Sequence, residues 1–251
     1  MKLGLISDIH GNLHALEQVL LELEERQVQL ILCAGDLVCY GAFPNEVIEL
    51  LRQKSIPTVL GNYDAAVAWD LPTVSSKPSS PQTEPIKLAA LAWAKAQISS
   101  KNVHYLRGLP WVTWQRLGDT TVQLLHGGPT QLDAWYDATS NSKLCELAET
   151  TAADLLVIGH SHQQFAIEVV RSIGEKTLIV NPGAVGRSID GDPRAAYAVI
   201  DLTTRQVELQ RAEYDLGAAT EAIRKSSMPS LVADLVYHAA RRVENLGTQK
   251  I

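Results

Sequence analysis

Short apolar runs that each end in a polar segment recur along this chain of 251 residues. Runs of this length are typical of buried β-strands. In an α/β sheet, ligands bind just beyond the carboxyl ends of the strands. We therefore expect the polar residues after the runs to share one site. The runs cover residues 3–6, 30–34, 57–60, 122–125, 155–158 and 178–180, and they end at Ser7-Asp8-Ile9-His10, Gly35-Asp36, Gly61-Asn62, His126-Gly127-Gly128, Gly159-His160-Ser161-His162 and Asn181-Pro182-Gly183.

Amphipathic helical patterns separate the first three runs. They cover residues 14–26 and 45–53, where apolar side chains recur at helical spacing. Asn12 precedes the first pattern, in position to cap a helix. Strands that alternate with helices predict βαβ units and a mainly parallel sheet in the first third of the chain.

The second half of the chain has a different pattern. Residues 164–170, 196–200 and 206–209 read as strands with little helix between them, which predicts antiparallel pairing and a second sheet. We expect a mixed α/β (α+β) fold in which two mixed sheets are flanked by helices, a four-layer αββα sandwich with extra helices at the C-terminus.

The chain length and its 46% hydrophobic content predict one domain, residues 1–251. We divide it into a core, residues 1–212, and a helical extension, residues 213–251, in which Pro229 breaks the helical pattern. Residues 71–85 contain four prolines among serines. This segment reads either as a surface loop or as a lid over the site.

The polar residues at the strand ends have the chemistry of metal ligands. Carboxylate, imidazole and amide oxygen suit Mn²⁺, Fe, Zn²⁺ or Mg²⁺ rather than copper. One isolated Asp-x-His is more often a cap or a core polar pair, but an ordered set of strand ends is much stronger evidence. The candidate metal ligands are Asp8, His10, Asp36, Asn62, His126, His160 and His162.

Five blocks of the sequence resemble the signature of the calcineurin-like metallophosphoesterases, in the order and with separations similar to those of the family. The resemblance spans residues 1 to about 190. The segments 7–12 and 181–183 look like the small bacterial and archaeal phosphodiesterase branch rather than the eukaryotic Ser/Thr phosphatases. The blocks are Asp8-x-His10, Gly35-Asp36, Gly61-Asn62-x-Asp64, His126-Gly127 and Gly159-His160-x-His162.

The resemblance implies two divalent metal ions and the hydrolysis of phosphodiesters or phosphomonoesters. A metal-bound hydroxide would attack phosphorus in line while the metals offset the charge on the phosphate oxygens. Mn²⁺ is the expected metal, with Fe, Zn²⁺, Ni²⁺ and Mg²⁺ as alternatives. By motif, one ion is assigned to Asp8, His10 and His162, the other to Asn62, His126 and His160, and Asp36 bridges the two; the expected catalytic residues are Asp36, Asn62, Tyr63 and Asp64.

The third block departs from the family pattern at Tyr63, where many members have a histidine that can protonate the leaving group. A phenol with a pKa near 10 is a poorer acid at neutral pH. We expect Tyr63 either to position phosphate through a weak hydrogen bond or to act only as a packing aromatic. Asp64 is expected to orient a neighbouring ligand.

Tyr40 occupies the position of an arginine that Ser/Thr phosphatases of the superfamily carry after the bridging aspartate. Arg187 or Arg194 could replace that phosphate contact, although the ordinary expectation for either is a surface arginine. The residues that we predict to bind substrate are Asn12, Tyr63 and Arg187.

The net charge of −6 and the absence of a basic run argue against a nucleic-acid polymer as partner. We expect a small phosphorylated or nucleotide-type substrate, with a phosphoprotein as the alternative. A protein Ser/Thr or Tyr phosphatase of the same fold and a non-catalytic metal-binding scaffold remain alternative functions.

No apolar run is long enough to span a bilayer, so no membrane partner is expected. The three cysteines are odd in number and form no C-x-x-C pair, which favours the reducing cytoplasm. Apolar residues near Leu231 and Leu235 could pack within the chain or in a homo-oligomer.

Overall fold

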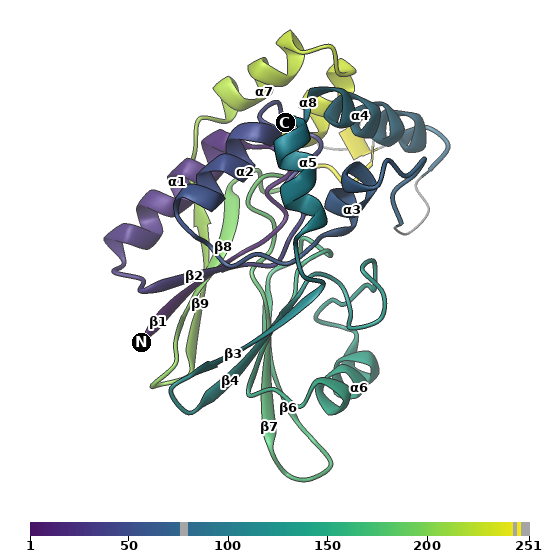
Figure 1. Cartoon of the computed structure of the whole chain (residues 1–251). Coiled ribbons are helices and arrows are strands. Elements are labelled where there is room, and N and C mark those ends of the chain that lie inside the picture. The colour runs from purple at the N-terminus through teal and green to yellow at the C-terminus, as the bar shows by residue number, and fades with distance from the viewer. Residues whose placement is uncertain (76–79, 243–244, 247–251) are drawn as a thin grey trace.

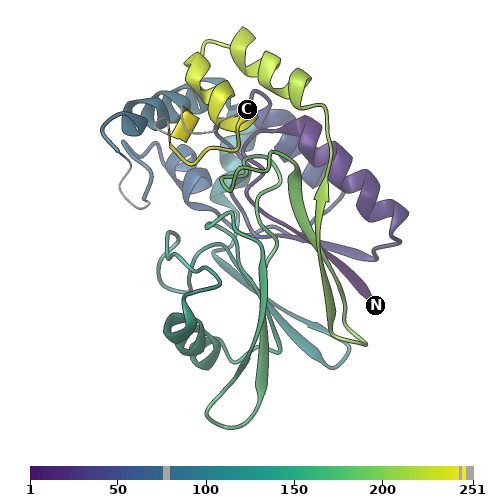
Figure 2. The ribbon, with the colours of Figure 1, turned by 180° about the vertical axis from the view of Figure 1, so that it is seen from behind.

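The first of two β-sheets contains the N-terminal strand. In the computed structural model, which describes residues 1–75, 80–242 and 245–246, the two sheets lie face to face (Figures 1 and 2). β1 is parallel to β2 but antiparallel to β8, which is antiparallel to β9. The strand order is β2-β1-β8-β9, with β1 at Lys2–Ile6, β2 at Leu30–Cys33, β8 at Ala195–Asp201 and β9 at Gln206–Ala212.

The second sheet contains the middle of the chain. Its three central strands, β4, β5 and β7, are parallel, and its two edge strands are antiparallel to their neighbours. The strand order is β3-β4-β5-β7-β6, with β3 at Val112–Leu117, β4 at Thr120–Leu125, β5 at Leu155–Val157, β6 at Phe165–Val170 and β7 at Lys176–Asn181.

Alternation of side chains along the strands sorts the core into layers. Leu3 and Leu5 of β1 pack between the sheets with Val122 and Leu124 of β4. On the outer face of the second sheet, Leu125 packs against a helix. Ile6 of β1 faces the helices that cover the first sheet.

Among the described residues, seven helices lie on the side of the first sheet and one lies on the second, as the arrangement in Figure 1 shows. The fold is thus the predicted sandwich of two mixed sheets flanked by helices. The seven are α1 (Leu13–Glu25), α2 (Pro44–Gln53), α3 (Asn62–Ala68), α4 (Thr83–Gln97), α5 (Ser100–Arg107), α7 (Leu216–Lys225) and α8 (Ser230–Tyr237), and the eighth is α6 (Asn141–Thr151). Within the described ranges, no helix is long and apolar enough to cross a bilayer.

Two predictions about strands were wrong. Residues 57–60 form only an isolated bridge between Cys33 and Thr58, and the chain then turns directly into α3. β8 and β9 are antiparallel, as predicted, but they join the first sheet beside β1 rather than the second sheet. β8 pairs with β1, almost 200 residues away in the sequence, and local patterns do not report such a pairing.

Several local predictions were confirmed. Asn12 caps α1, because its Oδ1 accepts a hydrogen bond from the backbone N–H of Ala15 at 3.2 Å. Pro229 lies between α7 and α8. The helical prediction beyond Tyr237 was too long, since α8 ends there, and residues 243–244 and 247–251 lie outside the described residues.

The proline-rich segment, residues 71–85, lies beside the strand-end loops. Residues 76–79, in its middle, are outside the described residues, and its last residues already belong to α4. The backbone oxygen of Ser75 accepts a hydrogen bond from Nδ2 of Asn62 at 2.7 Å, and Oγ of Ser75 donates to Asp133 at 2.7 Å. The segment therefore contacts a candidate ligand, and its function as a lid stays a prediction.

Candidate metal centre

The seven candidate ligands come together in one buried cluster between the carboxyl ends of the two sheets. Each has at most 7% of its surface exposed. The loops after β1 and β2 supply three of them, the loops after β4 and β5 supply three more, and α3 supplies Asn62 at its first residue. Both sheets therefore contribute to one site, where the sequence pattern predicted a shared sheet edge.

One group of three ligand atoms gathers around Asp8. Its Oδ1 lies 3.2 Å from Nε2 of His162 and 4.0 Å from Nε2 of His10, and the two imidazole nitrogens are 3.2 Å apart. All three atoms lie within 4.8 Å of one another. This is a compact donor set for one cation.

A second group gathers around Oδ1 of Asn62. It lies 2.9 Å from Nε2 of His126 and 3.2 Å from Nδ1 of His160. Asp36 lies between the groups, because its Oδ2 is 3.4 Å from Nε2 of His126 and 3.8 Å from Nε2 of His10. A carboxylate in this position can contact a cation in either group.

Backbone carbonyls orient three of the four imidazoles. Nδ1 of His10 lies 3.1 Å from the oxygen of Val38, and Nδ1 of His126 lies 2.7 Å from that of Ala34. Nδ1 of His162 lies 2.5 Å from the oxygen of Arg187. A carbonyl can only accept, so each Nδ1 donates, and each Nε2 faces the cluster as the atom that can bind a metal once it carries no proton.

Two atoms of the cluster are buried without a hydrogen-bond partner. They are Oδ1 of Asp8, which belongs to the first group, and Nε2 of His160, on the other side of its ring from the Nδ1 that meets Asn62. Unsatisfied buried polar atoms are rare in proteins, and each one calls for an explanation such as a bound ion. Oxygen and imidazole donors that converge at these distances fit divalent cations of the Mn²⁺, Fe and Zn²⁺ type.

The backbone at five of the ligands adopts the left-handed conformation. The φ angles are 53° at Asp8, 49° at His10, 58° at Asp36, 64° at His160 and 56° at His162. Non-glycine residues seldom adopt this conformation, and such strain concentrates at functional sites. Hydrogen bonds between loops hold it, for example from the N–H of Asp8 to the oxygen of Gly35 at 2.9 Å.

Asp64 holds the loop that carries Asp36. Its carboxylate accepts hydrogen bonds from the backbone N–H groups of Asp36 at 2.9 Å, Leu37 at 2.8 Å and Gly61 at 3.1 Å. Burial and then the charge of Asp36 raise the pKa of Asp64 to about 7. Oδ1 of Asp36 in turn accepts from the N–H of Tyr63 at 2.8 Å.

The imidazoles of the cluster differ in their affinity for protons. Burial alone would lower the pKa of His126, but the neighbouring Asp36 carboxylate raises it to about 9. Burial lowers the pKa values of His10 and His160 to about 4. At neutral pH, His10 and His160 are therefore ready to donate a lone pair, whereas His126 must first lose a proton.

A pocket of about 100 Å³ opens onto the cluster, and Tyr63 and Arg187 line it. The phenol oxygens of Tyr63 and Tyr40 are 2.5 Å apart. The guanidinium carbon of Arg187 lies 4.2 Å from the centre of the Tyr40 ring. The pocket therefore joins the candidate ligands to two of the residues predicted to bind substrate.

Two other candidates lie elsewhere. Arg194 forms an ion pair with Asp192 at 2.7 Å and does not line the pocket. Asn12 also lies outside the pocket lining, where it caps α1 and its Nδ2 donates to the oxygen of Gly186 at 3.1 Å. The structure thus places Arg187, rather than Arg194, beside the cluster.

Sequence reasoning missed five residues of the pocket wall, one of which, Ile189, lies in the loop between β7 and β8. Thr83 and Lys87 come from α4, Trp135 precedes α6, and Arg241 follows α8. None belongs to a motif, so only spatial proximity reveals them.

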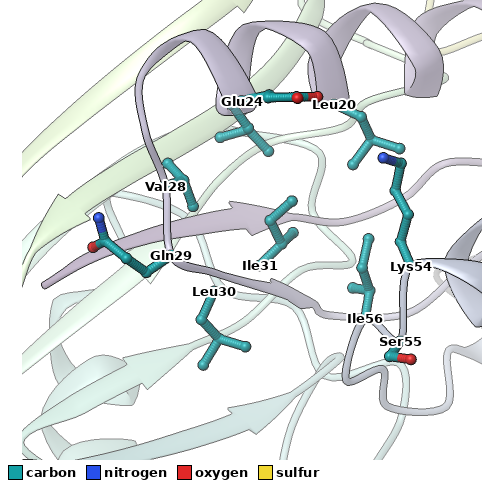
Figure 3. Close-up of a pocket in the computed structure, with 10 residues that line it drawn as sticks. Leu20, Glu24, Val28, Gln29, Leu30, Ile31, Lys54, Ser55 and Ile56 are labelled. Carbon is teal, nitrogen blue, oxygen red and sulfur yellow. The ribbon is translucent and has the colours of Figure 1, made fainter.

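A second cavity, of about 330 Å³, opens at the edge of the first sheet, beneath the end of α1 (Figure 3). Apolar side chains, including Leu20, Val28 and Ile56, line most of it, with Glu24 and Lys54 among them. It includes none of the candidate ligands. Of these two pockets, only the smaller one is lined by candidate metal ligands.

The sequence is similar to a known protein family and to a protein of another organism. A family model described as a calcineurin-like phosphoesterase superfamily domain matches residues 1–205. An uncharacterised protein of Methanocaldococcus jannaschii is 30% identical over 252 residues, which cover 94% of this chain and 97% of that protein.

Two solved structures share the fold over nearly the whole chain. A metallophosphoesterase from Sphaerobacter thermophilus is 29% identical, with a TM-score of 0.74 and coverage of 96% of this chain and 100% of that one. A hypothetical protein from Pyrococcus horikoshii is 20% identical, with a TM-score of 0.81 and coverage of 95% and 98%.

Proposed function

The chain belongs to the calcineurin-like phosphoesterase superfamily, and on that premise we propose that it is a metal-dependent hydrolase of small phosphomonoesters or phosphodiesters. The observation that carries the proposal is the convergence of carboxylate, imidazole and amide donors in two groups with Asp36 between them. The superfamily supports phosphoester hydrolysis; the metal dependence, the mechanism and the substrate are our proposals.

We propose that the two groups hold two divalent ions. When bound, such ions supply positive charge to the phosphate oxygens and lower the pKa of a water molecule for in-line attack. Mn²⁺ suits the mixed oxygen and nitrogen donors, as do Fe, Zn²⁺, Ni²⁺ and Mg²⁺. One ion would be held by Asp8, His10 and His162, the other by Asn62, His126 and His160, and Asp36 would be shared.

Tyr63 and Arg187 are the protein groups that we propose to bind the phosphate. Arg187 offers a fixed positive charge and paired N–H donors. Burial, and then the neighbouring Tyr40, raise the pKa of Tyr63 well above its ordinary value. Tyr63 therefore remains neutral and donates a hydrogen bond rather than a proton, so esters with good leaving groups should react faster.

The dimensions of the pocket favour a small substrate. Its volume is only about 100 Å³, and the ligands at its base are buried. A phosphoprotein would have to present its phosphate on a narrow, extended segment. The free cysteines, Cys33, Cys39 and Cys145, support our proposal of a reducing compartment such as the cytoplasm.

The test combines metal analysis with two model substrates. The purified protein should contain divalent metal and, with added Mn²⁺, should hydrolyse an aryl phosphomonoester, an aryl phosphodiester or both. Asp36→Asn should lower kcat/KM at least about 100-fold, because it removes the shared negative charge and one donor. Asp119→Asn is the matched control, since the side chain of Asp119 is fully exposed between β3 and β4.

Each outcome is decisive. A metal-containing protein that hydrolyses neither ester would contradict the enzymatic proposal and favour a metal-binding scaffold. Unchanged activity in Asp36→Asn would contradict the shared-ligand mechanism. Faster turnover of phosphopeptides than of both aryl esters would favour a protein phosphatase.

A further inference from the structure

Three basic side chains from separate parts of the chain surround the pocket above the candidate metal centre. Lys87 comes from α4, Arg187 from the loop between β7 and β8, and Arg241 from the segment after α8. The chain as a whole has a net charge of −6, yet Asp36 is the only carboxylate among the described residues that line this pocket. The local charge is therefore opposite to that of the whole protein.

Arg187 is held beside the candidate ligands with unused hydrogen-bonding capacity. Only 7% of its surface is exposed, and its buried Nε has no hydrogen-bond partner. Its guanidinium lies over Tyr40, and its backbone oxygen contacts His162. A buried arginine with an unsatisfied N–H at a pocket wall can bind an anion from that pocket.

Arg241 reaches the same pocket through an aromatic contact. Its guanidinium carbon lies 4.6 Å from the centre of a Trp135 ring, and Trp135 packs edge-on against His160 with 5.7 Å between ring centres. Burial, and then the positive charges of Arg242 and Arg187, lower the pKa of Arg241. Arg187 and Arg241 thus repel each other across the pocket, and an anion between them would relieve that repulsion.

Lys87, from α4, completes the group. It is 6% exposed, and its Nζ lies 3.1 Å from Oε2 of Glu84. Figures 1 and 2 both show α4 beside α8, so the wall that carries Lys87 adjoins the segment that carries Arg241. Long, nearly buried lysines are uncommon away from a charged partner or ligand.

The positive charge at this pocket exceeds what one phosphate needs. Two divalent ions together with the Asp8 and Asp36 carboxylates would leave about two positive charges, which match one phosphate dianion. The three basic side chains, less the charge of Glu84, add about two more. A second anionic group of similar charge would balance them.

We infer that the substrate carries two phosphate groups, that Lys87 and Arg241 bind the one that is not cleaved, and that Arg187, which contacts the scissile phosphate, is shared between the two. This inference rests on the proposed phosphoesterase function, whose pocket admits the scissile phosphate. The second phosphate lies toward the mouth, where Arg241 is exposed to solvent. The substrate class is a small molecule whose two phosphates are joined directly or by a short linker.

Binding of two non-hydrolysable probes separates this inference from the proposed activity. Propylphosphonate and propane-1,3-bisphosphonate share a chain and differ by one phosphonate. Calorimetric titration of the Mn²⁺-loaded protein should show that the bisphosphonate binds at least about 10-fold more tightly. Arg241→Gln and Lys87→Gln should each remove most of that ratio, and they should also weaken its dependence on salt.

Arg242→Gln is the matched control, because Arg242 is the exposed neighbour of Arg241 and does not line the pocket. Equal affinity for the two probes would overturn the inference and leave the phosphoesterase proposal intact. A preference that persists in both Arg241→Gln and Lys87→Gln would overturn the assignment to these residues. If neither probe bound the metal-loaded protein, phosphate binding at the centre itself would be contradicted. Thermal melting of each variant shows whether its fold is retained.

Discussion

The phenol oxygens of Tyr40 and Tyr63 lie 2.5 Å apart, and both rings pack edge-on against the imidazole of His10. Tyr40 occupies the position of an arginine in Ser/Thr phosphatases of the superfamily, and Tyr63 occupies the position of a histidine in many members. One hydrogen-bonded pair therefore replaces two charged or readily protonated groups. Its consequences are testable in both chemistry and stability.

Tyr63→His should restore an acid near neutral pH. We expect kcat for alkyl phosphate esters, whose leaving groups need a proton, to rise about 10-fold or more, and kcat for aryl esters to change less. Steady-state rates with a matched alkyl and aryl pair check this. Tyr63→Phe is the control, because it removes the phenol without adding an acid. Unchanged alkyl rates in a Tyr63→His variant that still binds metal would show that protonation is not limiting.

The two tyrosines should be coupled in stability. Tyr40→Phe or Tyr63→Phe alone leaves the other buried hydroxyl without its partner, which costs about 1–2 kcal/mol. The double variant should lose less than the sum of the two, by about 1 kcal/mol. Unfolding in urea measures all four free energies. Strict additivity would mean that the hydrogen bond contributes nothing to stability.

Metal affinity should rise with pH up to about 9. A metal ligand must be deprotonated, and the pKa of His126 is about 9, whereas those of His10 and His160 are about 4. Between about pH 7.5 and 8.5, Asp64 has mostly lost its proton, since its pKa is about 7. Binding of Mn²⁺ in that range should release close to one proton, measured by calorimetry in buffers of different ionisation enthalpy. A pH-independent affinity there would contradict the role of His126.

The raised pKa of His126 should also make the metal-free protein less stable as the pH rises, whereas metal affinity increases. The pKa of His126 is raised from 6.5 to about 9, so the folded state binds the proton more tightly than the unfolded state. This contribution to the free energy of unfolding is fully present below about pH 6.5 and is lost as the pH rises through about 9. Urea unfolding with a chelator, in wild type and His126→Gln, should show the two curves converging as the pH rises.

Gly159→Ala should displace Asp8 without replacing any of the candidate ligands. A Cβ at Gly159 would lie 2.0 Å from Oγ of Ser7 and 3.0 Å from Oδ2 of Asp8. We expect Mn²⁺ affinity to fall about 10-fold to 100-fold, as when groups that orient ligands are displaced. Gly108→Ala is the control, because its Cβ would meet no atom nearer than Tyr105 O at 3.4 Å. Equal affinities in the two variants would contradict the tight packing at Asp8.

The strands and the polar residues that follow them could be predicted because the signal is local. An apolar run such as 155–158 reports burial, and the polar group after it marks where the strand leaves the core. The order and spacing of these ends agreed with one family, so both the sandwich fold and the cluster of seven side chains were expected. The strand prediction for residues 57–60 was wrong because a buried extended segment and a paired strand have the same apolar sequence pattern.

By itself, then, the sequence determined which segments are apolar on which face, where polar groups interrupt them, and which donors are available for metal. The tertiary structure alone decided that β8 pairs with β1 in the first sheet and that both sheets, rather than one sheet edge, supply the ligands. It also decided that Lys87, Trp135 and Arg241 share a pocket with Arg187. The physical reason is that periodicity depends on neighbours along the chain, whereas strand pairing and pocket walls depend on contacts between residues far apart in sequence.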